Sequence, residues 1–341
     1  LELSQRLGLE NQLLHGLVIK ARQNPKKVVF AEGNNPKVLR AANEVLHDGT
    51  AIPILLGNEQ EIRQLITENQ FELDSVEIID PHSAEVGETR NLFASIIWEK
   101  RRRKGITQEE AYELTFNRNY FGILMVDTGF ADAMISGVTS HYGDVVSPAL
   151  KIIGPRPNLN HISSMYIVMT KRGPLFFADT TVNLDPDVQT LIETTLLTSE
   201  EVRKFNIEPV IAMVSYSNFG SVKSSEHTRT LDRVRQTITY LHQNHPDLCV
   251  DGEIQMNFAL NKDLRSQKFP FTLLENRDVN TIIFPNLTSG NIAYKLMQEI
   301  GGAEVVGPIL MGIQKPIHVV PMECSVREIV NMTTIAVVDA Q

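Results

Sequence analysis

The stretch Val28-Val29-Phe30-Ala31-Glu32-Gly33-Asn34-Asn35-Pro36 decides the fold class of this chain. An apolar run that ends in a glycine and two asparagines is typical of a buried strand, and Pro36 favours a helix start directly after the turn. Apolar residues then recur at helical spacing through residues 38–46, and a second apolar run, residues 52–56, ends at Gly57. This order predicts one βαβ unit with two parallel strands.

The same alternation of apolar runs and helical periodicity continues along the chain. Strands that alternate with helices predict an α/β fold with mainly parallel sheets. The length of 341 residues favours two domains, at about 150 residues each. The Gly/Pro-rich segment 154–158 is the expected boundary. The further apolar runs lie at residues 131–135, 175–178, 209–214, 281–284 and 317–320.

Composition excludes several classes of protein. The chain is 42% hydrophobic and 21% charged, which is a globular profile, and its net charge of −9 argues against a general nucleic-acid binder and favours a small anionic ligand. Its two cysteines, Cys249 and Cys324, cannot form a disulfide framework and lack metal-ligand spacing. No apolar run approaches the ~18 residues of a membrane span, so we expect a cytoplasmic protein.

Two strand-to-helix loops carry the strongest candidate ligand groups. Ligands of open α/β sheets bind beyond the carboxyl ends of the strands, where hydroxyls and backbone N–H groups can hold an anion. The alternative interpretation is that both loops are ordinary turns that cap the next helix, because Ser, Asn and Gly dominate such turns. The candidate residues are Ser217, Asn218, Gly220, Ser221, Asn286, Ser289, Gly290 and Asn291.

Other segments are weaker candidates. Ser136 and Gly137 begin a similar loop that ends at His141, a possible general base or a solvated histidine. Asp179 follows another strand and is a candidate buried acceptor that organises loops. The basic run 100–104 suits either phosphate binding or a solvated helix face. We expect no metal beside Asp251 and Glu253, because nothing else near them in sequence has ligand spacing.

Taken together, these motifs resemble the phosphate acetyl/butyryltransferase family along nearly the whole chain. The resemblance implies two three-layer α/β domains with an interdomain cleft, like phosphotransacetylase and isocitrate dehydrogenase. The first domain would comprise residues 1–157 plus 310–341, and the second 158–309. Family members are dimers, so we expect at least a homodimer. The matching segments are residues 29–33, 131–137, 177–180, 285–291 and 307–312.

A narrower resemblance favours the carboxyl-terminal transferase-like domain of large bacterial malic enzymes. It rests on residues 217–221, 250–253, 326–333 and the ending Ile335–Gln341. It implies that malic enzyme domains, with NADP and Mg²⁺ or Mn²⁺, precede this segment in the same chain. A start at Leu1 rather than Met fits a domain cut from such a protein.

The resemblance implies that only some of the family's catalytic positions are retained in this chain. The family's Ser-Arg pair is here Pro321-Met322, neither of which carries a charge or donates a side-chain hydrogen bond. A family arginine before Pro-Ala-Leu is here Ser147. Glu328 matches the acidic residue, and Arg101 matches a phosphate-binding arginine. Loss of one charge-stabilising donor costs ~10²–10³ in rate, so this comparison predicts little turnover.

The expected function is therefore a regulatory domain that binds acetyl-CoA as an allosteric effector and has no catalytic residues of its own. Effector control of this kind needs two states of the parent enzyme with different affinities. The alternative is an active phosphate acetyl/butyryltransferase, which converts acetyl-CoA and phosphate to acetyl phosphate and CoA. A third possibility is an oligomerisation scaffold.

Overall fold

A computed structural model describes residues 9–341 of the chain. Leu1 lies outside the described residues. The described chain separates into two compact units. The five-stranded unit comprises residues 14–157 and 313–341, and the six-stranded unit comprises residues 158–312 together with the described residues 9–13.

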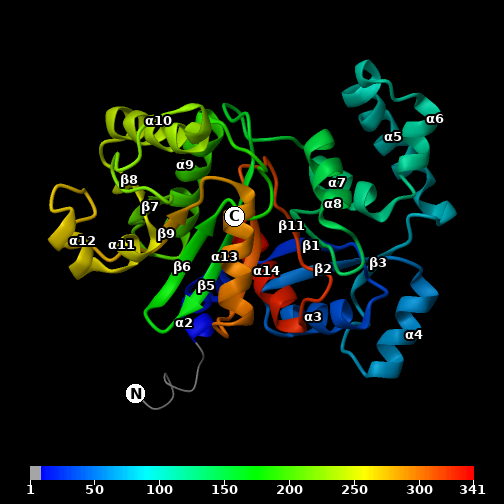
Figure 1. Ribbon diagram of the computed structural model, residues 1–341. Helices are drawn as coiled ribbons and strands as arrows, with labels where there is room; N and C mark the ends of the chain where they lie inside the picture. The colour runs from blue at the N-terminus through cyan, green and yellow to red at the C-terminus, as the bar shows by residue number, and fades with distance from the viewer. Residues whose placement is uncertain (1–8) are drawn as a thin grey trace, which may run out of the picture. The chain divides into compact units, whose positions relative to one another are not determined.

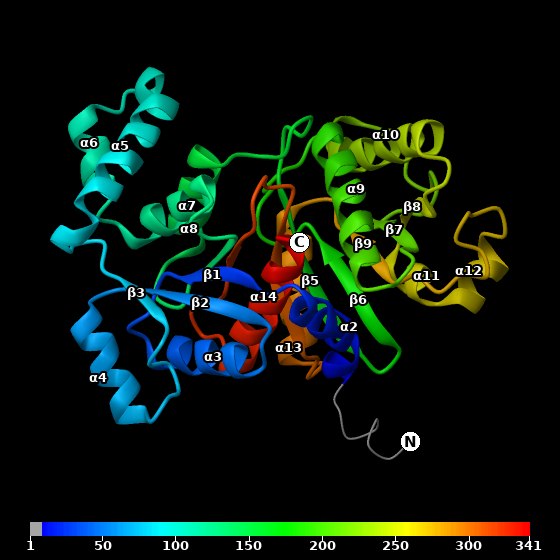
Figure 2. The same cartoon turned by 180° about the vertical axis from the view of Figure 1, so that it is seen from behind.

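The five-stranded unit contains one parallel sheet in the order β11-β4-β1-β2-β3. Helices α3 and α14 contact one face of the sheet, and α7 and α8 contact the other. Figure 2 shows α3 on one side of β1 and β2, with α7 and α8 on the other side. The elements are α2 (Leu9–Gln23), β1 (Lys26–Phe30), α3 (Pro36–His47), β2 (Ala51–Leu56), α4 (Glu59–Asn69), β3 (Glu77–Ile79), η1 (Ala84–Val86), α5 (Gly87–Arg101), η2 (Arg102–Lys104), α6 (Gln108–Leu114), α7 (Arg118–Thr128), β4 (Ala133–Ser136), α8 (Tyr142–Ile152), β11 (Ile317–Val319) and α14 (Val326–Asp339).

The predicted βαβ unit is present at the centre of this sheet. Strands β1 and β2 pair in parallel with Val29 opposite Ile54, and α3 connects them. Asn35 caps α3, because its side chain accepts a hydrogen bond from the N–H of Lys37, and Pro36 occupies the first helical position. The buried face of α3 is the apolar stripe that the sequence predicts.

The six-stranded unit contains a mixed sheet in the order β10-β5-β6-β9-β7-β8. Figure 1 labels β5, β6, β7, β8 and β9 of this sheet. Strands β6, β9, β7 and β8 are parallel, whereas β5 pairs antiparallel with both β6 and β10. Helix α9 contacts β5, β6, β9 and β10. The elements are β5 (Ser163–Thr170), β6 (Gly173–Ala178), α9 (Val188–Lys204), β7 (Ile211–Val214), η3 (Glu226–Thr228), α10 (Arg229–Asn244), β8 (Val250–Ile254), α11 (Met256–Leu260), α12 (Lys262–Lys268), β9 (Thr281–Ile283), α13 (Leu287–Glu299) and β10 (Val305–Met311).

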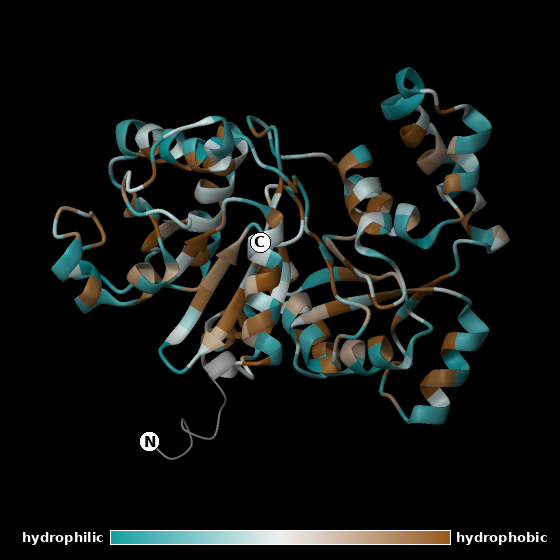
Figure 3. Ribbon diagram, viewed as in Figure 1, coloured by the Kyte–Doolittle hydropathy of each residue, from teal (hydrophilic) through white to brown (hydrophobic). Residues whose placement is uncertain are grey.

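The α/β class with mainly parallel strands is confirmed, but the sequence reading missed the antiparallel part of this sheet. Strand β5 is buried along almost its whole length, so it lacks the polar alternation that marks a strand with one solvated face. Figure 3 shows β5 and β6 mostly in brown, whereas α4 alternates between brown and teal. A continuous apolar run cannot be told from a buried helix by periodicity alone.

No helix between residues 9 and 341 combines the length and the apolar character that crossing a membrane requires.

Candidate functional site

Three loops meet the carboxyl edge of the six-stranded sheet, one each after β6, β7 and β9. These strands are neighbours and parallel, so their carboxyl ends lie on the same edge. The loops begin at Asp179, Ser215 and Phe284. Strand β8 ends at the same edge and contributes Glu253 just before its last residue.

Glu253 holds the loop that follows β7. Its buried carboxylate accepts hydrogen bonds from the Ser217 hydroxyl at 3.0 Å, the Gly220 N–H at 2.7 Å, and Nε and Nη2 of Arg235 at 3.0 and 2.9 Å. Burial raises the pKa of the Glu253 carboxyl, but the hydrogen bonds from Arg235, Gly220 and Ser217 outweigh it and leave the pKa lowered. Glu253 is therefore a charged anchor for this loop.

Most of the predicted ligand groups of this loop form hydrogen bonds that hold the loop itself in place. Ser217 is fully buried, and its hydroxyl lies 3.1 Å from the Ser221 hydroxyl. Ser221 accepts a hydrogen bond from the N–H of Asn218, whose own side-chain oxygen accepts one from the N–H of Gln255 at 2.8 Å. Gly220 has a φ of 87° and is exposed, so its turn conformation favours glycine.

The loop after β9 caps α13. Asn286 is the N-cap, and its side chain accepts a hydrogen bond from the Ser289 N–H at 3.0 Å. The Ser289 hydroxyl donates to the Asn286 carbonyl at 2.9 Å. Asn291 donates to the carbonyl of Thr180 at 3.1 Å, which ties α13 to the loop after β6.

Gly290 and Asp179 bring these two loops into close contact. A Cβ at the buried Gly290 would overlap the carbonyl oxygen of Asp179, so only glycine lets α13 approach this closely. The Asp179 carboxylate is buried and accepts hydrogen bonds from Ser164 at 2.6 Å and from the N–H of Asn183 at 2.8 Å. Asp179 is thus the loop-organising acceptor that its position after a strand predicts.

A cavity of about 410 Å³ opens between the loops after β7 and β9. Of the predicted site residues, it includes Asn286 and Ser289, while Ser217, Ser221 and Asn291 lie behind it as loop supports. Its walls are mostly apolar, which suits the organic part of a ligand, with a few polar groups to orient it. The other lining residues, which the sequence did not single out, include His227, Thr228, Thr230, Leu231, Met256 and Phe284.

In the five-stranded unit, Glu32 anchors the loop after β4, as Glu253 anchors the loop after β7 in the six-stranded unit. The buried Glu32 carboxylate accepts hydrogen bonds from the Ser136 hydroxyl at 3.2 Å, the Gly137 N–H at 3.0 Å and the Ser140 hydroxyl at 3.3 Å. Gly137 has a φ of 122°, and a Cβ there would overlap the carbonyl of Val320. Ser136 and Gly137 therefore have structural partners inside this unit.

The loop after β11 carries the two residues that replace the family's Ser-Arg pair. Pro321 is half-buried and Met322 is 47% exposed, so the Met322 side chain faces solvent. Neither side chain can polarise a reacting carbonyl or hold a phosphate. The backbone of the loop itself is well anchored, because the N–H of Val320 donates to the carbonyl of Ser136 at 2.8 Å.

Glu328, the predicted acid, forms a capping box at the start of α14. Its carboxylate accepts hydrogen bonds from the N–H and the hydroxyl of Ser325 at 2.7 and 2.8 Å.

The neighbouring thiol of Cys324 is buried. Burial, aided by the charges of Glu328 and Glu32 against that of Lys37, raises the Cys324 pKa to about 11. Cys324 is therefore a protonated, unreactive thiol at neutral pH.

Arg101 is the one residue of the run 100–104 that is half-buried. Its Nε is buried without a hydrogen-bond partner among residues 9–341. Burial raises the pKa of Tyr120, and the nearby Arg101 charge opposes that rise. Tyr120 directly follows Asn119, whose side chain forms hydrogen bonds with Ser136 and Ser140 in the loop after β4. Since the charge of Arg101 acts on Tyr120, Arg101 lies near this loop.

The remaining cations of the run are differently placed. Lys100 pairs with Asp127 at 2.8 Å, and Arg102 pairs with Glu99 at 3.1 Å. Outside the run, sequence reasoning missed Arg118, which donates to the Asn34 side chain at 3.4 Å beside the carboxyl end of β1. Arg118 opens α7, and no motif marked it.

His141 is exposed at the N-cap of α8 and makes no cap hydrogen bond.

Across residues 9–341, no three His, Cys, Asp or Glu side chains lie close enough together to bind a metal ion.

The chain matches the family model described as phosphate acetyl/butaryl transferase over residues 12–337, and it belongs to that family. It is 33% identical over 328 residues to the phosphate acetyltransferase of Clostridium acetobutylicum, with 94% of this chain and 96% of the relative covered. It is 34% identical over 336 residues to the phosphate acetyltransferase of Thermoanaerobacterium thermosaccharolyticum, at 96% and 99% coverage.

A solved structure of similar fold is the phosphotransacetylase from Streptococcus pyogenes. The TM-score is 0.88 and the sequences are 34% identical, with 97% of this chain and 98% of that chain covered. Since 97% of this chain is covered, the similarity extends over both units.

These relatives contradict the expectation of a malic enzyme domain. They are phosphate acetyltransferases whose whole length, at 96–99% coverage, corresponds to this chain. The expected malic enzyme domains, NADP and Mg²⁺ or Mn²⁺ therefore have no support, and neither does acetyl-CoA as a pure effector of an inactive transferase domain.

Proposed function

We propose that this protein is a phosphate acetyltransferase, which transfers an acetyl group between the thiol of coenzyme A and phosphate. The observation that carries the proposal is identity of 33–34% to proteins of that name along 94–96% of this chain. A small anionic substrate also agrees with the two strand-to-helix loops, because backbone N–H groups at helix N-termini can hold an anion. We also propose a cytoplasmic location, in keeping with the two free cysteines.

The chemistry sets what the site must supply. In the direction of acetyl-CoA formation, the thiol loses its proton, its sulfur bonds to the acetyl carbon, and the bond from that carbon to the phosphate oxygen breaks. The departing phosphate takes the electron pair, so cations that hold it lower the barrier. Within the five-stranded unit we assign this role to Arg101, whose Nε lacks a partner, with Arg118 as a second cation.

Within the six-stranded unit we assign the 410 Å³ cavity to an apolar portion of the thioester substrate. Tyr216 is 60% exposed at this cavity, and Met256, Leu231 and Phe284 supply apolar surface. Asn286 and Ser289 offer the few polar groups that would orient the ligand. The walls contain no Lys, Arg, Asp or Glu, so this cavity is unsuited to a phosphate.

The test is acetyl-CoA formation from coenzyme A and acetyl phosphate, followed by the absorbance of the thioester. We expect turnover with the intact chain, and Arg101→Ala should lower kcat/KM for acetyl phosphate by about 10²–10³. Arg103→Ala is the matched control, since Arg103 belongs to the same run and is exposed. A chain that binds coenzyme A without turnover, or an Arg101→Ala variant as active as Arg103→Ala, would contradict the proposal.

A further inference from the structure

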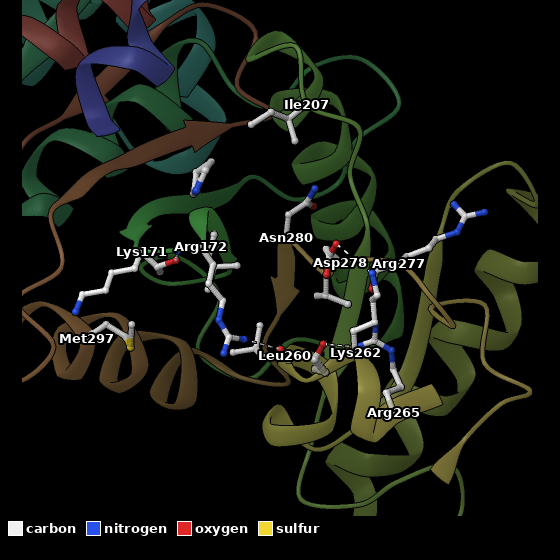
Figure 4. A pocket seen from close by; sticks show the side chains of 15 residues that line it. Lys171, Arg172, Ile207, Leu260, Lys262, Arg265, Arg277, Asp278, Asn280 and Met297 are labelled. Atoms are coloured by element: carbon white, nitrogen blue, oxygen red, sulfur yellow. Dashed lines mark hydrogen bonds and ion pairs between the residues drawn. The ribbon is translucent and has the colours of Figure 1, made fainter. Parts of the chain in front are cut away.

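A second cavity lies at the opposite, amino-terminal edge of the six-stranded sheet. Its volume is about 640 Å³, and it is formed by the β5–β6 turn, the segment before β9, helices α11 and α12, and Met297 of α13 (Figure 4). Strands β6 and β9 begin at this cavity and end at the loops described above. It shares no lining residue with the cavity at the carboxyl edge.

The charge of this cavity is opposite to that of the whole chain. Five cationic side chains line it against a single acidic one, Asp278. The whole sequence has 32 Lys and Arg against 41 Asp and Glu. An excess of cations around one cavity of an acidic protein raises the local concentration of anions. The five cationic residues are Lys171, Arg172, Lys262, Arg265 and Arg277.

Arg265 is a fully buried cation, and the charge of Asp278 acts on it without a direct ion pair. Its guanidinium donates to the carbonyls of Phe258, Ala259 and Leu274 and to that of Arg277. These bonds satisfy its N–H groups, but carbonyl dipoles only partly balance a charge removed from water. Among the described residues no carboxylate lies within 4 Å of it, so an anion in the adjoining cavity would gain from its field.

The other cations leave room for a ligand. Lys171 in the β5–β6 turn is exposed and has no partner among the described residues. The guanidinium of Arg172 donates to the carbonyl of Leu260, at 3.1 Å, and to no other described residue. Lys262 lies 3.6 Å from Asp278, whose side chain is 88% exposed, so this pair is weak and easily exchanged. Figure 4 shows Arg172 and Lys262 on either side of Leu260.

Between these cations the surface is aliphatic and contains no aromatic ring. An inorganic anion would leave this apolar surface exposed to water. A molecule with a hydrocarbon portion would bury the surface, and burial stabilises the complex by about 25 cal/mol per Å² of apolar area. The absence of a ring in the lining also removes the stacking partner that a nucleobase would use. The aliphatic residues are Pro174, Leu175, Ile207, Leu260, Val279 and Met297.

We propose that this cavity binds an organic anion with an aliphatic portion and a phosphate or carboxylate head, at a site separate from the loops at the carboxyl edge. The head group lies among Lys171, Arg172 and Lys262, and the hydrocarbon lies on Leu175, Leu260 and Met297. The proposal does not depend on acetyl transfer.

The experiment is calorimetric titration of octyl phosphate and of octanoate, below their micellar concentrations, into the intact chain. We expect saturable binding of at least one of them, and the tighter of the two identifies the head group. Lys171→Glu should weaken binding about tenfold without structural loss, because Lys171 has no partner to lose. The double variant Lys171→Glu/Arg172→Glu should weaken it further, to about a hundredfold.

The matched control is Lys268→Glu, which makes the same change of charge at an exposed position of α12 that does not line the cavity. This variant should bind like the wild type. The proposal is overturned if neither anion binds at millimolar concentration, if Lys268→Glu weakens binding as much as Lys171→Glu, or if octanol binds as tightly as octyl phosphate.

Discussion

Three buried carboxylates fix the loops at the carboxyl edges of both sheets. Glu32 and Asp179 lie just beyond the end of a strand, and Glu253 lies one residue before the end of β8. Each accepts hydrogen bonds from N–H groups of an adjoining loop. A charged acceptor makes roughly twice as strong a hydrogen bond as a neutral one. The polar residues of these loops are thus held in place before any ligand arrives.

Glu253→Gln should lower the free energy of unfolding by about 1–3 kcal/mol at pH 7, because it leaves the Arg235 guanidinium without its buried counterion. Urea unfolding measures this value. Glu226→Gln, an exposed change in the same unit, is the control and should stay within about 0.5 kcal/mol of the wild type.

The pH dependence gives a second check on Glu253. Its folded-state pKa is lowered, so its stabilising contribution is fully present above the unfolded-state pKa of about 4.3 and disappears as pH falls through the folded-state value. The difference in unfolding free energy between wild type and Glu253→Gln should therefore shrink below about pH 4. A difference that stays constant from pH 7 to pH 3 would contradict this role.

At the residue scale, the sequence marked the right loops without showing which way their side chains point. Ser217 looks like a ligand group in a serine-rich turn, but its hydroxyl meets Glu253, which is 36 residues away in sequence. His227 and Met256 line the cavity at the carboxyl edge, yet neither belongs to a local pattern. Contacts that join distant segments have no signature in a short window of sequence.

At the scale of elements, helix α13 depends on one glycine. Gly290→Ala places a methyl group against the Asp179 carbonyl, so α13 or the loop after β6 must move. We expect a loss of about 1–3 kcal/mol in the free energy of unfolding, measured in urea. Gly143→Ala in α8 is the control, since a Cβ there meets nothing within 4 Å and alanine favours the helix. Equal stability of the two variants would show that the close approach has no cost.

The loop after β11 permits a gain-of-function test of the proposed activity. Pro321→Ser with Met322→Arg introduces a hydroxyl and a cation at the positions where the family resemblance expects them. Met322 is 47% exposed, so an arginine fits there without disturbing the core. We expect acetyl transfer to rise by about 10²-fold, in line with the usual cost of losing such donors. Met322→Leu should leave the rate unchanged, and a double variant no faster than the wild type would contradict the assignment.

Local patterns predicted the parallel elements better than the antiparallel ones. Strand β1 and helix α3 carry a strand run, a turn and a capped helix in one short segment, and the structure has each of them. Strands β5 and β10 are buried runs whose pairing is decided by partners elsewhere in the chain: β10 begins 135 residues after Thr170 ends β5. The basic cavity is likewise assembled from five separate segments.

At the scale of the whole molecule, nearly all of the six-stranded unit is one continuous stretch, residues 158–312, with its own sheet and core, and the described residues 9–13 also belong to it. We propose that it is a domain, and we expect this segment to fold alone. A fragment of these residues should show a cooperative urea transition and a dispersed amide NMR spectrum. A fragment without a cooperative transition would contradict the proposal.

The five-stranded unit provides the contrast, because it is discontinuous. A fragment of residues 14–157 lacks β11 and α14, and α14 contacts α3, β1, β2 and β4. Without this helix a large part of the apolar core is exposed to water, so the fragment should show no cooperative transition.

The return of the chain to the five-stranded unit has a consequence for synthesis in the cell. Pro155 and Ile313 form a β-bridge, so the chain leaves and re-enters this unit at one place after 157 intervening residues. Strand β11 and helix α14 leave the ribosome only after all of residues 158–312. The five-stranded unit, whose strands β1 to β4 are made before β5, is thus completed last, and until then β4 presents an unpaired edge that can pair with another chain. Nascent chains should therefore be most prone to aggregation, and most in need of chaperones, during this interval.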